Sequence, residues 1–260
     1  MDLGLQGRRA LVLGASRGLG KGIASRLAQE GCDLCIAARN YEKLQLEGAG
    51  FSKKYGNKVE AYHLDLCDET SVERFISQMK SISVDILVNN CGGPPPTPIL
   101  GVDLHIWQQY FESMVLSIIR LTDALVPQMR FRGWGRVLSI VSTGVVQPIS
   151  SLIVSNSLRS ALVAWSKTLA TEVARDGVTV NTLAPGRIST ERINELDEAA
   201  AIRQKLDFDE VRKNNENNLP IGRYGEVEEF AAVAAFLVSQ NASYLTGQLI
   251  CVDGGLVAGI

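Results

Sequence analysis

Gly14-Ala15-Ser16-Arg17-Gly18-Leu19-Gly20 follows an apolar run at residues 10–13, and an amphipathic helical pattern begins at the end of this stretch. Strand, glycine-rich turn and helix in this order are typical of the first unit of a dinucleotide-binding fold. Glycine permits a positive φ and lets the backbone approach a pyrophosphate, which the amides of the helix N-terminus then bind. The residues expected to bind a dinucleotide here are Gly14, Ser16, Arg17, Gly18, Leu19 and Gly20.

The same alternation continues along the chain. Further strand patterns occupy residues 33–38, 58–63, 86–89, 136–142, 179–183 and 248–252, and helical patterns occupy residues 19–30, 41–55, 69–80, 103–132, 155–174 and 227–238. Helices of this length between successive strands are the crossovers of a parallel sheet that is covered on both faces. The sequence therefore predicts an α/β fold, with residues 1–260 forming a single doubly wound (Rossmann) domain around a seven-stranded parallel sheet.

The stretch at residues 188–222 breaks this alternation. It is polar and charged, and it contains the run Lys213-Asn214-Asn215-Glu216-Asn217-Asn218. It follows the sixth strand, and ligands of open α/β sheets bind beyond the carboxyl ends of the strands. We therefore expect it to cover the substrate, either as a helical lid or as a mobile loop. Pro94, Pro95 and Pro96 follow the fourth strand at the same edge, and they exclude a helix there.

Composition limits the kinds of partner. The 260 residues are 46% hydrophobic, which suits one well-buried domain, and the formal net charge is -2 with no basic cluster. We expect neither a nucleic-acid nor a membrane partner. No apolar run approaches the ~18 residues of a membrane span and the first nine residues lack an apolar signal core, so a cytoplasmic location is expected. The five cysteines lack the spacing of metal ligands and predict reduced packing residues and no metal site.

The end of the second strand indicates which dinucleotide is bound. A carboxylate at this position binds the ribose 2′-hydroxyl of NAD and would repel a 2′-phosphate. No acid occurs between Leu34 and Tyr41, whereas Arg39 and also Arg17 can donate charge-assisted hydrogen bonds to a phosphate. The sequence therefore favours NADP(H) over NAD(H). The alternative is that both arginines are ordinary solvated surface residues.

Four further segments follow in a specific order. They are Asp65-Leu66, Asn89-Asn90-Cys91-Gly92, residues 181–186 with Thr190, and residues 244–255. Together with the glycine turn they resemble the short-chain dehydrogenase/reductase family of the classical type, over essentially all 260 residues, and they are most similar to its β-ketoacyl-carrier-protein reductases. The resemblance implies that the remaining cofactor contacts are Asp65, Leu66, Asn90, Cys91, Gly92, Pro185, Gly186, Ile188 and Thr190.

The same resemblance implies a catalytic serine, a Tyr-x-x-x-Lys pair and an asparagine, and the chain departs from this set. The family serine falls on Ser142, but the tyrosine position is Ser155, the lysine position is Arg159 and the asparagine position is Met114. A shifted alignment does not explain the difference, because no Tyr lies between Tyr110 and Tyr224. The helix also continues in the family register after Arg159.

Three functions fit these residues. The first is an NADP(H)-dependent oxidoreductase with an atypical catalytic site, which acts on a small carbonyl or alcohol substrate. The second is a catalytically silent NADP(H)-binding sensor or partner subunit, and the third is lyase or isomerase chemistry on the same scaffold. Ser142, Ser155 and Arg159 are the catalytic candidates, and Arg159 suits either the nicotinamide ribose or a carboxylate or phosphate group.

The resemblance also implies self-association. Members of the family commonly form homotetramers or homodimers. We expect the contact between subunits to involve apolar side chains on two neighbouring helices, at Val115, Leu116, Ile118, Ile119, Leu158, Leu162, Val163 and Trp165.

Overall fold

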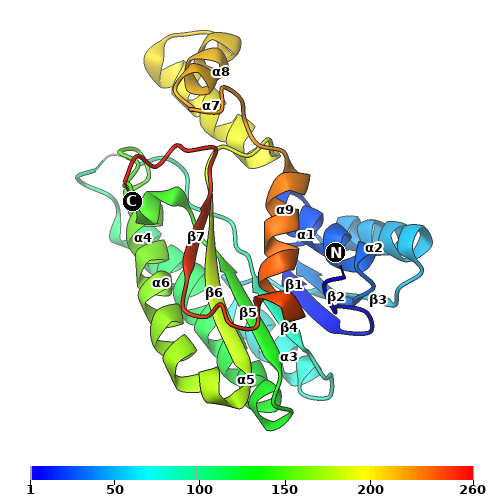
Figure 1. Cartoon of the computed structure of the whole chain (residues 1–260). Coiled ribbons are helices and arrows are strands. Elements are labelled where there is room, and N and C mark those ends of the chain that lie inside the picture. The colour runs from blue at the N-terminus through cyan, green and yellow to red at the C-terminus, as the bar shows by residue number, and fades with distance from the viewer. Residues whose placement is uncertain (1, 98, 260) are drawn as a thin grey trace.

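A seven-stranded parallel sheet forms the centre of the computed structural model, which describes residues 2–97 and 99–259 (Figure 1). The strands are β1 (Arg9–Leu13), β2 (Asp33–Ala38), β3 (Val59–His63), β4 (Ile86–Asn89), β5 (Gly135–Ile140), β6 (Val178–Pro185) and β7 (Leu249–Val252). Their order across the sheet is β3-β2-β1-β4-β5-β6-β7, and every pairing is parallel. The predicted fold class is therefore confirmed, and the strand order reverses direction between β1 and β4.

Two hydrophobic cores lie on opposite faces of the sheet, because successive side chains of a strand point to opposite sides. In β1, Ala10 and Val12 pack in one core, beneath the helices at residues 18–29 and 227–237. Leu11 and Leu13 pack in the other core, beneath the helices at residues 69–79, 117–131 and 153–173. All four side chains are fully buried. A strand buried on both faces is a continuous apolar run, which is why the short run at residues 10–13 marks a central strand.

The helices occupy both faces of the sheet (Figure 1). Their bounds are α1 (Gly18–Gln29), α2 (Tyr41–Tyr55), α3 (Glu69–Met79), α4 (Leu104–Phe111), α5 (Ser117–Phe131), α6 (Ile153–Val173), α7 (Glu191–Gln204), α8 (Phe208–Asn217) and α9 (Val227–Leu237). No helix among the described residues is long and apolar enough to cross a membrane.

Most predicted elements agree with the structure to within two residues at each end, and two differences lie near the site. The single helix expected over residues 103–132 is interrupted by a π-helical turn, η1 (Glu112–Leu116), which separates α4 from α5. The fifth strand ends at Ile140, two residues earlier than expected, because Ser142 instead begins a short 3-10 turn, η2 (Thr143–Val145). Both differences lie at the cavity described below, where regular backbone geometry is most often broken.

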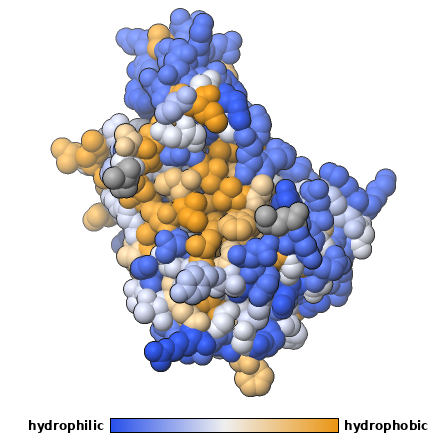
Figure 2. All heavy atoms as spheres, in the orientation of Figure 1, coloured by the Kyte–Doolittle hydropathy of each residue, from blue (hydrophilic) through white to orange (hydrophobic). Residues whose placement is uncertain are grey.

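The stretch at residues 188–222 contains two helices, α7 and α8. Figure 1 shows this pair projecting from the end of the sheet to which β6 leads, and Figure 2 shows that its surface is polar. Of the two forms expected from the sequence, the structure has the helical one. The capping box of α8, formed by Asp207 and Glu210, explains how so polar a segment begins a helix.

The residues expected to join subunits are only partly available. The side chains of Val115, Ile118, Leu158 and Leu162 are buried within the chain's own cores. The expectation was therefore wrong for these four positions. Figure 2 shows hydrophobic side chains over the face on which β7 lies, and each of the four residues of this edge strand is half-buried.

Candidate active site

A cavity of about 960 Å³ lies beyond the carboxyl ends of β1, β4, β5 and β6. This position beside the reversal of strand order is where open α/β sheets bind ligands. Of the residues expected at the cofactor site, only Gly20 does not line the cavity. Those that line it are Gly14, Ser16, Arg17, Gly18, Leu19, Arg39, Asp65, Leu66, Asn90, Cys91, Gly92, Pro185, Gly186, Ile188 and Thr190. The three catalytic candidates, Ser142, Ser155 and Arg159, line it as well.

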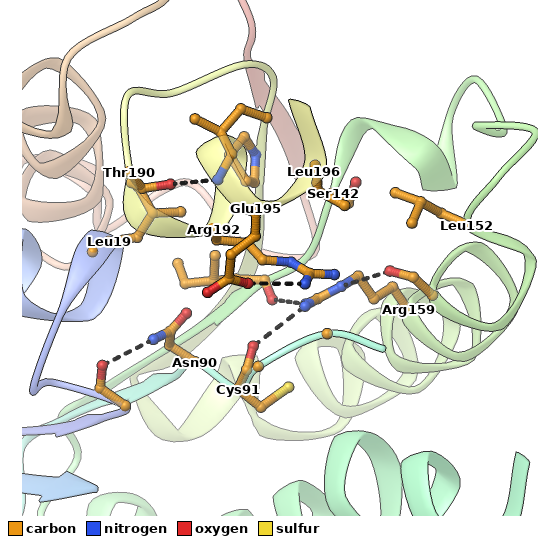
Figure 3. Close-up of a pocket in the computed structure, with 18 of the residues that line it drawn as sticks. Leu19, Asn90, Cys91, Ser142, Leu152, Arg159, Thr190, Arg192, Glu195 and Leu196 are labelled. Atoms are coloured by element: carbon orange, nitrogen blue, oxygen red, sulfur yellow. Dashed lines mark hydrogen bonds and ion pairs between the residues drawn. The ribbon is translucent and has the colours of Figure 1, made fainter. Parts of the chain in front are cut away.

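The glycine turn is tightly packed. Gly14 has φ +63°, and a Cβ at this position would lie 2.6 Å from Asn90 Nδ2. A Cβ on Gly20 would lie 2.3 Å from the carbonyl oxygen of Gly14. Asn90 holds the turn by donating through Nδ2 to the carbonyl oxygens of Leu13 (3.2 Å) and Gly14 (3.4 Å) (Figure 3). Gly20 therefore serves the site by allowing the first turn of α1 to approach β1, although it lines no part of the cavity.

The N-terminus of α1 faces this cavity and suits an anion. Arg17, the N-cap residue, makes no side-chain capping bond, and the first turn contains no acidic residue. The first amide groups of a helix lack intrahelical acceptors and carry a partial positive charge. The glycines of the turn leave the backbone uncovered by side chains. Together with the free amides of α1, this backbone fits the pyrophosphate of a dinucleotide.

The end of β2 borders the same cavity. Arg39 is exposed there, and Asn40 caps α2 by accepting a hydrogen bond from the backbone N–H of Lys43 (2.9 Å). After the neighbouring strand β3, one carboxylate oxygen of Asp65 accepts a hydrogen bond from the backbone N–H of Cys67 (3.0 Å). No hydrogen bond or ion pair of the described residues engages the Arg39 guanidinium, so it remains accessible to a ligand.

Arg17, in contrast, is already paired. Its guanidinium contacts Glu191 (2.9 Å) and Glu195 (3.2 Å) of α7, and Glu191 also approaches Lys43 (3.6 Å). The hydrogen bond to Glu191 raises the pKa of Arg17, and the same bond lowers the pKa of Glu191. Arg17 therefore lines the cavity as expected, but the carboxylates of α7 already engage its Nη1.

Ser142 follows β5, and its hydroxyl is oriented by the turn that it begins. Ser142 Oγ accepts a hydrogen bond from the backbone N–H of Gly144 (3.1 Å), which leaves the hydroxyl proton for another acceptor. This arrangement suits the carbonyl oxygen of a substrate in the cavity. Asn156 does not share it, because its Nδ2 donates to the carbonyl oxygen of Ile149 (2.8 Å) and it does not line the cavity.

Ser155 and Arg159 lie one turn apart on α6, as residues four positions apart do. The Arg159 Nε donates to Ser155 Oγ (3.3 Å), Nη1 to the carbonyl oxygen of Ile140 (2.8 Å) and Nη2 to that of Cys91 (3.3 Å) (Figure 3). Arg159 is 8% exposed, and none of these partners is a carboxylate. The positively charged guanidinium of Arg159 therefore forms part of the cavity wall without a counter-ion.

Two neighbours complete this wall. Burial raises the pKa of the Cys91 thiol, although the adjacent Arg159 opposes this shift, so Cys91 is a neutral group at physiological pH. Met114, which the resemblance implied for the asparagine position, is 1% exposed and packs with Val115, Val154 and Leu158. It lies in the π-helical turn and has no group that could bind water.

Comparison with known proteins identifies the family. A family model described as enoyl-(acyl carrier protein) reductase matches residues 14–257. The 3-oxoacyl-[acyl-carrier-protein] reductase FabG of Aquifex aeolicus is 31% identical over 262 residues, which cover 98% of this chain and 100% of that protein. The chain belongs to the short-chain dehydrogenase/reductase family.

Two further proteins are similar to this chain over nearly its whole length. The NADPH-dependent reductase BacG of Bacillus subtilis is 29% identical, with 97% of this chain and 99% of that protein covered. The crystal structure of L-sorbose reductase from Gluconobacter frateurii, complexed with NADPH and L-sorbose, matches with a TM-score of 0.94 and 32% identity over 100% of both chains.

Sequence reasoning missed the residues that α7 contributes to this short-chain dehydrogenase/reductase cavity. Arg192 Nη2 donates to the carbonyl oxygen of Pro94, and Arg192 Nη1 contacts Glu195 (3.3 Å). Gly93 lies between Arg192 and Arg159, which come from different helices. Their shared position has no signal in the sequence, because α7 lies in a polar segment whose docking depends on the tertiary fold.

A buried carboxylate holds α7 to the rest of the chain. Asp197 is 1% exposed and accepts hydrogen bonds from Tyr224 Oη (2.6 Å), Arg187 Nη1 (2.9 Å) and Asn215 Nδ2 (2.9 Å). These partners come from α8 and from the segments that flank the two helices. A buried carboxylate with three donors is expected to hold the α7–α8 pair in one orientation.

We expect Tyr224→Phe to lower stability by about 1–3 kcal/mol, because Asp197 then lacks one donor. Burial and the bond to Asp197 raise the pKa of Tyr224 to about 12. Its unfolded pKa is about 10, so the neutral phenol's contribution is fully present below pH ~10 and is lost between pH ~10 and ~12. Thermal unfolding from pH 7 to 11.5 should therefore show a difference between the wild type and Tyr224→Phe that shrinks above pH ~10.

The matched control is Tyr244→Phe, since Tyr244 is fully exposed. This variant should unfold like the wild type at every pH. A Tyr224→Phe variant that also does so would show that the bond to Asp197 contributes nothing to stability.

Proposed function

We propose that this chain is an NADP(H)-dependent oxidoreductase that acts on a small carbonyl or alcohol substrate through an atypical catalytic site. The observation that carries the proposal is one cavity lined by the glycine turn, by Arg39 and by the group Ser142, Ser155 and Arg159. The relatives support it, since one is a reductase crystallised with NADPH and another is an NADPH-dependent reductase.

The residues of the glycine turn would hold the pyrophosphate, and Asp65 with Leu66 would contact the adenine. Asn90 and Cys91, with the segment from Pro185 to Thr190, would hold the nicotinamide end. When bound, NADPH supplies a hydride to the carbonyl carbon of the substrate. Ser142 would donate its free hydroxyl proton as a hydrogen bond to the carbonyl oxygen, which fixes the carbonyl for that transfer.

The negative charge that develops on the carbonyl oxygen would be stabilised by the positively charged guanidinium of Arg159. Neither Arg159 nor Ser155 is acidic enough to donate a proton at neutral pH, so water would protonate the oxygen. General acid catalysis typically contributes about 10²–10⁴-fold, and a slow reductase is therefore expected.

A second function is favoured by a specific observation, the burial of Met114 in an apolar cluster at the family's asparagine position. With the tyrosine and lysine also replaced, the chain would bind NADP(H) as a catalytically silent sensor or partner subunit. Both functions predict that the chain binds NADP(H), but only the first predicts turnover of a substrate.

The deciding experiment is NADPH binding by fluorescence, followed by turnover assays with ketones, alcohols and acyl thioesters. Stereospecific oxidation of NADPH with any of these carbonyl substrates would exclude the silent function. NADPH binding without turnover across the set would support the silent function, and absence of binding would contradict both.

We expect Arg39→Ala to weaken NADPH binding by about 10- to 100-fold, because hydrogen bonds to charged groups contribute about 1.5–3 kcal/mol. NADH affinity should stay within about twofold, since NADH lacks the 2′-phosphate. Titration of both cofactors into wild type, Arg39→Ala and the distant control Arg74→Ala checks this. Equal losses of affinity for NADPH and NADH would show that Arg39 does not bind the 2′-phosphate.

The helices at residues 188–222 would act as a lid, and Arg17 links the lid to the cofactor. Glu191 and Glu195 compete with a 2′-phosphate for Arg17, because both carboxylates contact its Nη1. The double variant Glu191→Gln, Glu195→Gln should therefore bind NADPH up to about fivefold more tightly, because exposed ion pairs contribute about 0.2–1 kcal/mol. Calorimetric titration tests this, and an unchanged affinity would mean that Arg17 is not a phosphate ligand.

Self-association is the remaining part of the proposal. The half-buried edge strand β7 and the hydrophobic face around it in Figure 2 support a homodimer or homotetramer that covers this strand. Sedimentation velocity should give a mass of two or four chains. A monomer at micromolar concentration would refute this assembly.

A further inference from the structure

We propose that Arg159, Arg192 and Ser155 form an anion clamp for a carboxylate of the substrate, so that the substrate class is an oxo acid. This inference rests on the proposed function for the hydride transfer, but the clamp itself is a binding site that can be measured without turnover. The argument depends on the charge of Arg159, on where Arg192 meets it and on which groups of the cavity already serve the cofactor.

Arg159 carries an uncompensated buried charge. It is 8% exposed, and its three hydrogen bonds go to one hydroxyl and two backbone carbonyls. A guanidinium has five N–H donors, so two remain for a ligand. Burying a charge is unfavourable unless an opposite charge accompanies it. Among the described residues no carboxylate contacts Arg159, and an anion bound in the cavity would supply the missing charge.

Arg192 brings a second guanidinium to the same place. A Cβ built on Gly93 would lie 3.6 Å from Arg159 Nη2, 3.8 Å from Arg192 Nη2 and 4.0 Å from Ser155 Oγ. Figure 3 shows the two arginines reaching this part of the cavity from α6 and α7. Three donor groups therefore surround the open face of Gly93, where no side chain intervenes.

The nearby acid does not neutralise the pair. Glu195 is shared between Arg192 (3.3 Å) and Arg17 (3.2 Å), and the other polar contact of Arg192 is the carbonyl oxygen of Pro94. Two guanidinium groups with part of one carboxylate leave a net positive charge at Gly93. Arginine binds planar carboxylates bidentately, which suits a carboxylate held between two guanidinium groups.

The anion is expected to come from the substrate, because the cofactor's phosphates have other partners. The glycine turn and the N-terminus of α1 fit the pyrophosphate, and Arg39 lies at the end of β2 for the 2′-phosphate. The clamp is close to the catalytic serine instead. Arg159 Nη1 binds the carbonyl oxygen of Ile140, two residues before Ser142. A carboxylate in the clamp would therefore leave a neighbouring carbonyl group near the Ser142 hydroxyl.

The reaction that follows is balanced. In the oxo acid the carbon–oxygen π bond breaks, the hydride of NADPH forms the new C–H bond, and a proton from water forms the O–H bond. NADPH is oxidised to NADP⁺ and the oxo acid is reduced to a hydroxy acid, while the carboxylate is unchanged. Binding of a charged group away from the reacting carbon positions the substrate, which partly compensates for the missing tyrosine.

The test compares 2-oxo and 3-oxo acids with their methyl esters, which keep the carbon skeleton and lose the charge. We expect the acids to exceed their esters in kcat/KM by about 10- to 100-fold, in line with charge-assisted hydrogen bonds. Arg192→Met should raise KM for the acids by about 10-fold or more. KM for the esters and the Kd for NADPH should stay within about threefold. Arg74→Met, with the same change of charge on α3, should leave all these values unchanged.

Gly93→Ala provides a variant that changes no charge. Its methyl group would meet the three donor groups at ordinary contact distances, so the fold is retained while the space for the carboxylate is filled. KM for the acids should therefore rise. Acids and esters reduced equally well by the wild type, or an unchanged KM for the acids in Gly93→Ala, would overturn the clamp. So would a collapse of NADPH affinity in Arg192→Met, which would assign the clamp to the cofactor.

Calorimetric binding of the same acids to the NADPH complex separates the clamp from the reductase function. Arg192-dependent binding without turnover would support the clamp and refute the reductase. Turnover of neutral carbonyl compounds without binding of acids at millimolar concentration would do the reverse. Preference for hydroxyacetone phosphate over every acid would replace the carboxylate by a phosphate ester, and would thus overturn the oxo-acid assignment.

Discussion

Replacing Ser155 by Tyr and Arg159 by Lys is expected to raise the reduction of neutral ketones by about 10²–10⁴-fold, the usual contribution of a general acid. Ser155 lines the cavity, so a phenol at this position can project into it beside Ser142. The side chains at positions 155 and 159 are already in contact, with 3.3 Å between Ser155 Oγ and Arg159 Nε. A lysine at 159 would keep the positive charge next to the phenol and lower its pKa toward the working pH.

The control is the double variant Ser155→Phe, Arg159→Lys, which adds the same ring without the hydroxyl. It should show no gain, because only the phenol can donate a proton. Turnover is measured as kcat with saturating NADPH, with the Kd for NADPH determined beside it. If NADPH binds and the tyrosine variant is no faster than the phenylalanine variant, the cavity is not that of a weakened reductase.

Gly20→Ala should reduce NADPH affinity by more than about 100-fold, a loss that corresponds to about 2.8 kcal/mol. The added Cβ would lie 2.3 Å from the Gly14 carbonyl oxygen and 2.7 Å from Asn90 Nδ2, so the turn and α1 must move apart. That movement disrupts the amides expected to bind the pyrophosphate. Overpacking of this kind also destabilises the fold by about 1–3 kcal/mol. Fluorescence titration and urea unfolding measure the two effects separately.

Gly50→Ala is the matched control within the same chain. Gly50 lies in α2, and a Cβ there would meet nothing within 4 Å. This substitution should raise the free energy of unfolding by about 0.5–1 kcal/mol, because alanine favours the helix, and it should leave NADPH binding unchanged. If Gly20→Ala behaved like Gly50→Ala, close packing at the glycine turn would not be what the cofactor site requires.

The positions of the strands and of most helices could be predicted because they depend on neighbours along the chain. The run at residues 10–13 is apolar throughout since both faces of β1 are buried, and the glycine turn follows it because only a bare backbone allows Gly14 and Gly20 to meet. Ser142, Ser155 and Arg159 were expected from the resemblance to the family, and the structure places all three on the wall of the cavity.

Charge pairing could not be predicted in this way. Arg17 meets Glu191 across 174 positions of sequence, and Arg192 meets Pro94 across 98. The two residues of each contact belong to distant segments, and no sequence pattern connects them. The sequence also does not distinguish an arginine that is solvated from one that is paired. The fold also decided which apolar residues of α5 and α6 are buried inside the chain. Ile118 and Leu162 lie in its core, but the sequence pattern at these positions would be the same if they lay at an interface between subunits.

The sequence alone thus determined the strands and the glycine turn, because backbone sterics and the pattern of apolar residues act between near neighbours. The resemblance to the family supplied the three catalytic candidates. Only the tertiary structure decided what those candidates face. The sheet order places β1, β4, β5 and β6 around one cavity, and the docking of α7 then brings Arg192 to Gly93 beside Arg159. Distances between remote residues depend on how the elements pack together, which no local pattern contains.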